Sequence, residues 1–168
     1  GLCLLIIWLP RLFNMLSLLT EDGSDLKDTE ARVKAIFILQ RLVTDEPQEY
    51  KEQELAFNRI LTGCPFQVPL PKTLKLADYE IMTIESMIIG IKNNCEKFKN
   101  ISAKGFQLNF IERPGRLEQR EDKWVLYVEG RSYDMLLDFL PWSYRLVQLP
   151  WLEKRINVVW RDKGEFDF

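Results

Sequence analysis

The residues best suited to chemistry are two carboxylates, Asp134 and Asp138, which stand four apart in a segment with helical periodicity. Two carboxylates on one helical face can hold a divalent metal or share a proton. The opposite face of this segment is apolar, so a solvated acidic edge on a packed helix is the simpler interpretation. A small enzyme built on this pair is therefore kept only as an alternative.

Other catalytic arrangements lack a required residue or spacing. The chain contains no histidine, and histidine is the usual general base near neutral pH and the commonest metal ligand. No serine stands in a Gly-x-Ser-x-Gly setting, and the glycines lack the spacing of a phosphate-binding loop. Arg113-Pro114-Gly115-Arg116 could clamp an anion, but Pro-Gly between two arginines more simply forms a turn. The sequence therefore predicts a protein that is not an enzyme, with no cofactor and no metal.

Composition sets the broad class. The chain has 168 residues, of which 46% are hydrophobic and 29% charged, as expected for one globular domain. Its net charge of -2 gives no footprint for a phosphate backbone, so no nucleic acid is expected as a partner. Cys3, Cys64 and Cys95 are far apart in mostly apolar surroundings, which favours buried thiols in a reducing compartment. Glycine stands first, so we expect a processed product or a piece of a longer chain.

The opening segment, residues 2–19, is the one stretch that suggests a membrane. Its uninterrupted apolar run ends at Pro10 and Arg11, which is too short to cross about 30 Å of hydrocarbon. A basic leader and a small-residue cleavage site are also missing. We expect a buried core helix that kinks or restarts at Pro10 and no direct membrane binding. A membrane-associated module using residues 2–19 is the alternative from a different class.

Apolar periodicity places helices first and strands last. We expect helices at about 2–19, 29–43, 53–62, 76–96, 102–111 and 132–140, and strands at about 116–120, 124–129, 144–148 and 156–160. This order predicts an α+β fold, with a mainly helical N-terminal two-thirds followed by a small antiparallel sheet with an inserted helix. The domain is expected to span residues 1–160, and residues 161–168 form a charged tail.

Two Leu-Pro-Trp triplets, at 140–142 and 149–151, mark the C-terminal part of the chain. Each proline removes a backbone donor and favours an extended conformation for the leucine before it. The segment is therefore predicted to be a rigid ribbon with two corners. Tryptophans at such corners can pack in the core or anchor a protein interface, and both uses stay open. The candidate partner-binding residues are Pro141, Trp142, Pro150 and Trp151, whereas Trp124 and Trp160, on strands, are expected in the core.

Several short motifs follow one another in a characteristic order. They are Gly1-Leu2-Cys3-Leu4-Leu5, Leu9-Pro10-Arg11-Leu12-Phe13, Leu61-Thr62-Gly63-Cys64-Pro65, Pro114-Gly115-Arg116-Leu117, Asp134-Met135-Leu136-Leu137-Asp138-Phe139-Leu140-Pro141-Trp142 and Leu149-Pro150-Trp151-Leu152. In this combination, over residues 1–160, the chain resembles the C-terminal domain of the contractile injection system tape measure family. Ile7-Trp8 departs from the more polar dipeptide expected there, and the tail lies outside the pattern.

The resemblance implies a non-enzymatic part of a phage-tail-like particle, in which the tape measure lies inside the inner tube and sets its length. As one helix, 168 residues would reach roughly 250 Å, whereas a compact domain of this size has a radius of gyration of about 15 Å. A long helical or disordered region is therefore expected upstream, and this domain is expected to dock at one end of the tube.

For the docking itself we expect a cap-side adaptor, with anchoring at the baseplate end as the alternative. The partners implied by the resemblance are the inner tube and the tube terminator or cap proteins, with three or six copies around the particle axis. The implied location is the bacterial cytoplasm during assembly and then the assembled particle.

Overall fold

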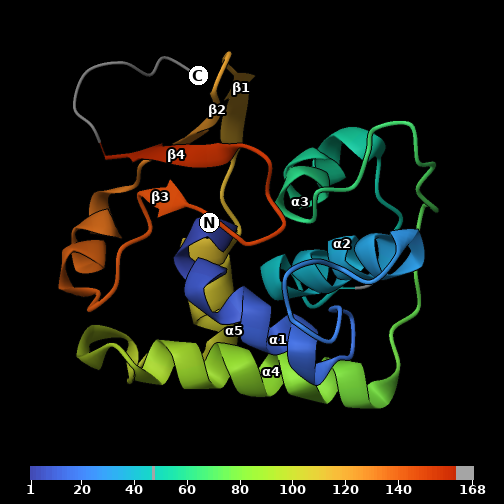
Figure 1. Cartoon of the computed structure of the whole chain (residues 1–168). Helices are drawn as coiled ribbons and strands as arrows, with labels where there is room; N and C mark the ends of the chain where they lie inside the picture. Colours follow the sequence, from blue (N-terminus) through green and yellow to red (C-terminus); the bar gives the residue numbers. More distant parts are fainter. Residues whose placement is uncertain (47, 162–168) are drawn as a thin grey trace.

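A computed structural model describes residues 1–46 and 48–161 of the chain. Its helical segments are, in order, η1 (Leu2–Trp8), α1 (Leu9–Met15), α2 (Thr29–Val43), η2 (Glu52–Leu55), α3 (Ala56–Leu61), α4 (Asp78–Asn93), η3 (Glu96–Phe98), α5 (Ala103–Phe106), η4 (Gln107–Ile111) and η5 (Ser132–Phe139). The strands are β1 (Gly115–Gln119), β2 (Lys123–Val128), β3 (Leu146–Val147) and β4 (Arg155–Trp160). The sheet lies at one end of the molecule and α4 at the other (Figure 1).

The opening segment forms two consecutive helices in the middle of the core. The 3-10 helix η1 passes into α1, and Pro10 stands in the first turn of α1, where its missing N–H costs nothing. The predicted restart at Pro10 is therefore confirmed. The predicted end near residue 19 is too late, because α1 ends at Met15 and Ser17 adopts a left-handed conformation with φ of 56°. Leu19 then forms an isolated bridge with Leu26.

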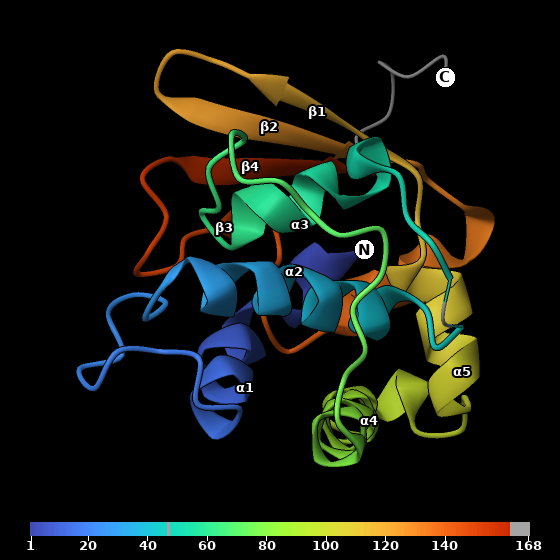
Figure 2. The same ribbon diagram turned by 90° about the vertical axis from the view of Figure 1, so that its right-hand side faces the viewer.

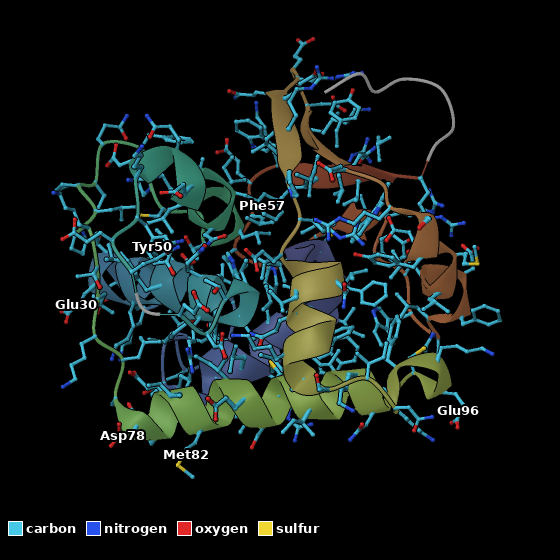
Figure 3. The ribbon with its side chains drawn as sticks, turned by 180° about the vertical axis from the view of Figure 1, so that it is seen from behind. Glu30, Tyr50, Phe57, Asp78, Met82 and Glu96 are labelled. Atoms are coloured by element: carbon cyan, nitrogen blue, oxygen red, sulfur yellow. The ribbon has the colours of Figure 1, made fainter. Side chains whose placement is uncertain are left out.

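Helices α2 and α4 form two sides of the helical half of the core. The Oδ1 atom of Asp28 accepts a hydrogen bond from the Ala31 N–H at 2.7 Å and caps α2. Ile84, Ile88 and Ile91 form the buried stripe of α4, as their spacing predicts. Met82 points away from that stripe into solvent (Figure 3). Ser102 caps α5, since its Oγ accepts from the Gly105 N–H at 3.0 Å.

The four strands form one mixed sheet in the order β1-β2-β4-β3. The pairs β1–β2 and β3–β4 are antiparallel, whereas β2 and β4 run parallel with Trp124 opposite Ile156. The predicted α+β class is thus confirmed, and the expectation of an antiparallel sheet is wrong for this central pair. Parallel neighbours require a crossover connection, and residues 129–154, which include η5 and β3, supply it.

One face of the sheet closes the core. Ile156, Val158 and Trp160 alternate along β4 and pack with Leu126 and Val128 in the main hydrophobic cluster. Figure 2 shows the strands at the top of the molecule and the helices below them. The three cysteines are free and buried, as predicted from their apolar surroundings. Residues 162–168 of the predicted tail lie outside the described residues.

Candidate functional site

The segment from Leu140 to Leu152, here called the ribbon, is anchored at both corners by its tryptophans. The indole N–H of Trp142 donates to the Leu4 carbonyl oxygen at 2.9 Å. The indole N–H of Trp151 donates to the Leu61 carbonyl oxygen, also at 2.9 Å. One corner is therefore hydrogen-bonded to η1 and the other to the end of α3. Each bond joins residues that are more than eighty positions apart in the sequence.

The first corner rests on an aromatic pair. The rings of Trp142 and Trp8 meet edge to face, with centroids 4.5 Å apart and planes at 87°. Trp142 is only half-buried, and Pro141 beside it is exposed. Trp8 is one residue of the Ile7-Trp8 dipeptide that departs from the expected family pattern, so this departure has a packing role inside the domain.

The second corner is buried more deeply. Trp151 is 9% exposed, and its ring lies 5.6 Å from that of Phe13, between centroids. Its neighbour in space is the turn after α3, where Gly63 has φ of 62°. A β-carbon on Gly63 would stand 2.9 Å from Arg32 Nη1 and 3.4 Å from the Trp151 carbonyl oxygen. The left-handed turn and the close packing together explain why glycine stands here.

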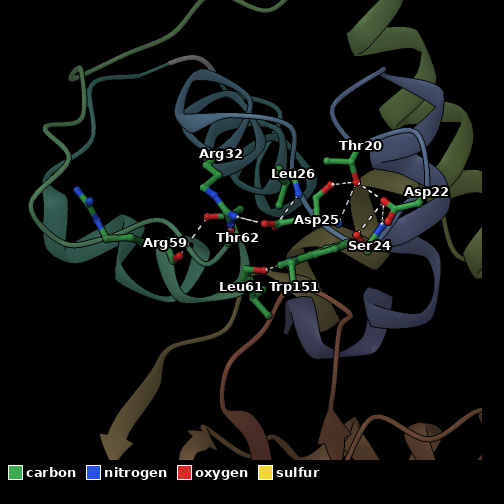
Figure 4. A network of polar contacts seen from close by, with 10 residues as sticks. All are labelled: Thr20, Asp22, Ser24, Asp25, Leu26, Arg32, Arg59, Leu61, Thr62 and Trp151. Carbon is green, nitrogen blue, oxygen red and sulfur yellow. Dashed lines mark hydrogen bonds and ion pairs between the residues drawn. The ribbon is translucent and has the colours of Figure 1, made fainter.

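An arginine fixes the same turn from the other side. Arg32 donates from Nη1 to the Thr62 carbonyl oxygen at 2.6 Å and from Nη2 to both oxygens of Asp25, at 2.7 and 2.8 Å. Figure 4 shows this network beside the bond from Trp151 to Leu61. The loop that follows α1, the start of α2 and the end of α3 are thereby joined beneath the second corner of the ribbon.

The solvent-facing side of the ribbon is formed mainly by residues other than the two anchoring tryptophans. Pro141 and Pro150 are exposed, and Leu146 between them is 46% exposed. Both indole N–H groups have intramolecular acceptors. Of the four predicted partner-binding residues, the two prolines and the open part of Trp142 are thus accessible, whereas Trp151 belongs to the core. Trp160 is buried and Trp124 packs against the core, as predicted.

The acidic pair is divided by the local helix geometry. Residues 132–139 form a 3-10 helix with three residues per turn, so side chains four apart do not share a face. Asp134 points inward and is fully buried, whereas Asp138 is exposed. The interpretation as a shared acidic edge is therefore wrong for Asp134. Asp138 forms an ion pair with Arg161. The hydrogen bond that the Arg161 guanidinium donates in this pair lowers the pKa of the Asp138 carboxyl.

Asp134 instead closes a buried polar cluster. Its Oδ1 lies 2.5 Å from Arg113 Nη2, and its Oδ2 accepts from the Trp160 indole N–H at 2.9 Å and from the Arg131 N–H at 2.8 Å. The Arg113 side chain also donates to the carbonyl oxygens of Asn109 and Glu129, at 2.7 and 3.0 Å. Arg113 is thus committed inside the protein, and the anion clamp considered for residues 113–116 does not form.

Residues 1–46 and 48–161 contain no group of three or more His, Cys, Asp or Glu side chains arranged to hold a metal. Within these ranges no helix is both long and apolar enough to cross a membrane. The apolar side chains of residues 2–19 that suggested a membrane are largely those of the core, including Leu4, Leu9 and Phe13.

A comparison with known families gives a match over nearly the whole chain. The family model of the contractile injection system tape measure protein matches residues 1–160. The chain therefore belongs to this family, which is a structural component of a contractile particle. No curated protein and no solved structure gives a significant match. The match covers both corners of the ribbon and the buried Arg113–Asp134–Trp160 cluster.

Proposed function

We propose that this domain is the docking end of its tape measure rather than the ruler itself. The observation that carries the proposal is the double anchoring of the ribbon on Leu4 and Leu61, which draws the first helix, the end of α3 and the sheet into one body. Most of the buried apolar residues in the described ranges belong to one core cluster. A body of this kind has a radius of gyration of about 15 Å and cannot measure a tube by its own length.

The ribbon is the surface we assign to docking. Its tryptophans fix the two corners from inside, and Pro141 and Pro150 limit the backbone conformations outside. A surface already held in one conformation loses little entropy on binding. Exposed Leu146 adds an apolar contact between the two prolines. These features support a contact with a partner protein of the particle.

For the position in the particle we propose the cap end of the inner tube. There the domain would act as an adaptor between the tube and its terminator or cap proteins, with three or six copies around the axis. The support is the resemblance of the ordered motifs together with the family match over residues 1–160. The baseplate end is the second candidate, because a docking module suits either end of a tube.

Cryo-electron microscopy of assembled particles tests the position. Density for this domain at the cap end is the expected result, and density only at the baseplate end favours the second candidate. Absence of the domain from both ends would overturn the docking role.

Two surface variants test the ribbon separately. Pro141→Ser and Pro150→Ser alter exposed side chains and remove no buried contact. We expect both to fold, as judged by circular dichroism, with a loss of stability of about 0.5–1 kcal/mol, and to reduce incorporation into particles. Pro71→Ser is the matched control, because Pro71 is exposed in the connector before α4. Normal incorporation of both ribbon variants would rule out the ribbon as the contact surface.

A further inference from the structure

A groove runs between α1 and α4, which lie beside each other at the end of the molecule opposite the sheet (Figure 1). One wall is formed by Trp8 at the end of η1 and by Arg11 and Met15 of α1. Met87 and Gly90 of α4 belong to the other wall. Among the described residues, nothing stands within 4 Å of the place where a β-carbon on Gly90 would be. The groove is therefore open to side chains from outside.

The size and lining of this groove suit side chains of another protein. Its volume is about 240 Å³, below the roughly 300–1,000 Å³ of pockets that enclose a whole small molecule. Its walls include Met15, which is 57% exposed, and Met87. Methionine side chains adapt to irregular partner surfaces, because they are flexible and polarisable. The groove is therefore fitted to accept one or two apolar side chains.

Arg11 gives the groove a positive charge. Among the described residues that line the groove, Arg11 alone is charged. The fold accounts for the rest of the motif at residues 9–13, because its two leucines and its phenylalanine are buried and Pro10 stands in the first turn of α1. Arg11 is exposed, and within residues 1–46 and 48–161 it forms no ion pair. A partner for this groove should therefore carry a carboxylate beside its apolar side chains.

The outward face of η5 has this combination. Met135 and Phe139 are 59% and 57% exposed, and Asp138 beside them is exposed as well. A 3-10 helix places residues three apart on one face, so Met135 and Asp138 point the same way. Asp138 uses Oδ1 for its ion pair with Arg161, and a carboxylate can accept from a second cation through its other oxygen. The face thus presents two apolar side chains and a carboxylate.

One copy of the chain leaves both surfaces exposed. Met15 on the groove and Met135 and Phe139 on η5 are each more than half exposed. The Phe139 ring lies beneath Lys97 Nζ, 4.7 Å from the ring centroid, and Phe139 is not among the residues that line the groove. Figures 1 and 2 place η5, drawn in orange, apart from α1. The two surfaces can therefore meet only when they belong to different copies.

We propose that η5 of one copy docks in the groove between α1 and α4 of a second copy. In this contact Met135 and Phe139 enter the groove. The Asp138 carboxylate pairs with the Arg11 guanidinium. The two surfaces differ, so the contact is heterologous, and repetition of such a contact around an axis closes a ring. Several copies around the particle axis are joined in this way. Only that last step rests on the proposed function, because the contact itself needs no other protein of the particle.

Sedimentation equilibrium of the full chain over a series of concentrations tests the contact. We expect reversible association of several chains as the concentration rises. Arg11→Asp and Asp138→Arg should each stay monomeric under the same conditions. An equimolar mixture of the two variants should associate again, because every groove then meets an η5 of opposite charge. A monomer at all concentrations for the unchanged chain, undiminished association of both variants, or a mixture that stays monomeric would overturn the proposal.

The apolar part of the contact has its own test. Phe139→Ala should weaken the association by about tenfold, the usual effect of removing a central aromatic side chain from an interface. Phe66→Ala is the matched control, because Phe66 is also exposed and its ring also lies beneath a cation, with the Arg59 guanidinium 5.7 Å from the centroid. This control should leave the association unchanged, and circular dichroism should show both variants folded. Equal weakening by the two variants would contradict the assigned contact.

These measurements use the isolated chain, so their failure is distinct from failure of the docking role. Pro141 and Pro150 of the ribbon take no part in the contact between copies. A chain that stays monomeric would therefore overturn this contact, whereas the ribbon variants and the particle images decide the docking role separately.

Discussion

Arg113 and Asp134 form an ion pair in the interior, with Arg113 Nη2 2.5 Å from Asp134 Oδ1 and both side chains fully buried. The pair joins the loop before β1 to η5, and Trp160 at the end of β4 donates to the same carboxylate. The guanidinium also lies 5.2 Å from the centroid of the Tyr133 ring and 5.5 Å from that of Trp160. Both charges are thus enclosed by hydrogen bonds and aromatic rings, which offsets their loss of water.

The first prediction is that Asp134→Asn strongly destabilises the fold. The variant leaves a buried guanidinium without its counter-charge, so urea unfolding should show a loss of about 3–5 kcal/mol. Asp138→Asn is the matched control, because the Asp138 side chain is exposed and its partner Arg161 is partly exposed, and it should change stability far less than Asp134→Asn does. Similar losses in both variants would mean that the buried Arg113–Asp134 pair contributes no more to stability than the exposed Asp138–Arg161 pair.

The sequence predicts local features of this fold but not the buried Arg113–Asp134–Trp160 cluster. The α+β class, the restart at Pro10, the stripe of α4 and the cap at Ser102 all follow from local patterns, and the structure confirms them. Such features depend on residues within a few positions of each other. The corners of the ribbon also follow from local sequence, because Pro141 and Pro150 restrict the backbone there.

The remaining features depend on contacts between distant residues. Local sequence patterns assign Arg113, Asp134 and Trp160 to three separate features: a turn, an acidic pair and a strand in the core. The pairings of β1 with β2 and of β2 with β4 bring Gly115, Val128 and Trp160 side by side at one end of the sheet. There Arg113 and Trp160 both bond to Asp134 of η5. The orientation of Asp134 follows from a 3-10 helix, and the apolar pattern of residues 133–140 predicts an α-helix equally well.

The second prediction separates the two ribbon tryptophans. Trp151→Ala removes a buried ring and its hydrogen bond to Leu61, so the loss of stability should be about 3–5 kcal/mol. Trp142 is half-buried, and Trp142→Ala should cost less, about 1–3 kcal/mol. If Trp142→Ala stays folded by circular dichroism and particle assembly fails, the exposed part of this ring belongs to the interface. A larger loss of stability in Trp142→Ala than in Trp151→Ala would contradict the order predicted here.

The third prediction contrasts two glycines. Gly63→Ala introduces a β-carbon 2.9 Å from Arg32 Nη1 at a backbone φ of 62°, and it should destabilise the protein by about 1–2 kcal/mol. Gly90 lies inside α4, and among the described residues nothing stands within 4 Å of the place where its β-carbon would be. Gly90→Ala should therefore stabilise by about 0.5–1 kcal/mol. Thermal unfolding of the two variants should move the midpoint in opposite directions, and a shift of the same sign would refute the argument from backbone conformation.

The fourth prediction concerns Glu80 in the first turn of α4 and the dependence of stability on pH. Burial raises the pKa of this carboxyl, but the ion pair with Lys34 at 2.7 Å and the hydrogen bond from the Ala77 N–H at 2.8 Å outweigh burial, and the pKa ends below its usual 4.5. A lowered pKa in the folded state means that the ionised group stabilises the fold above the unfolded pKa. This stability is lost as the pH falls through the folded pKa.

Glu80→Gln should therefore cost about 1 kcal/mol at neutral pH, since the amide keeps the shape of the side chain and loses its charge. In urea titrations at a series of pH values, the difference from the unchanged protein should shrink steadily below about pH 4.5, the usual pKa of a glutamate. Asp78→Asn, which alters an exposed carboxylate in the same helical turn, is the control and should show a smaller difference throughout. A difference for Glu80→Gln that stays constant from neutral to acidic pH would show that the carboxylate charge does not stabilise the start of α4.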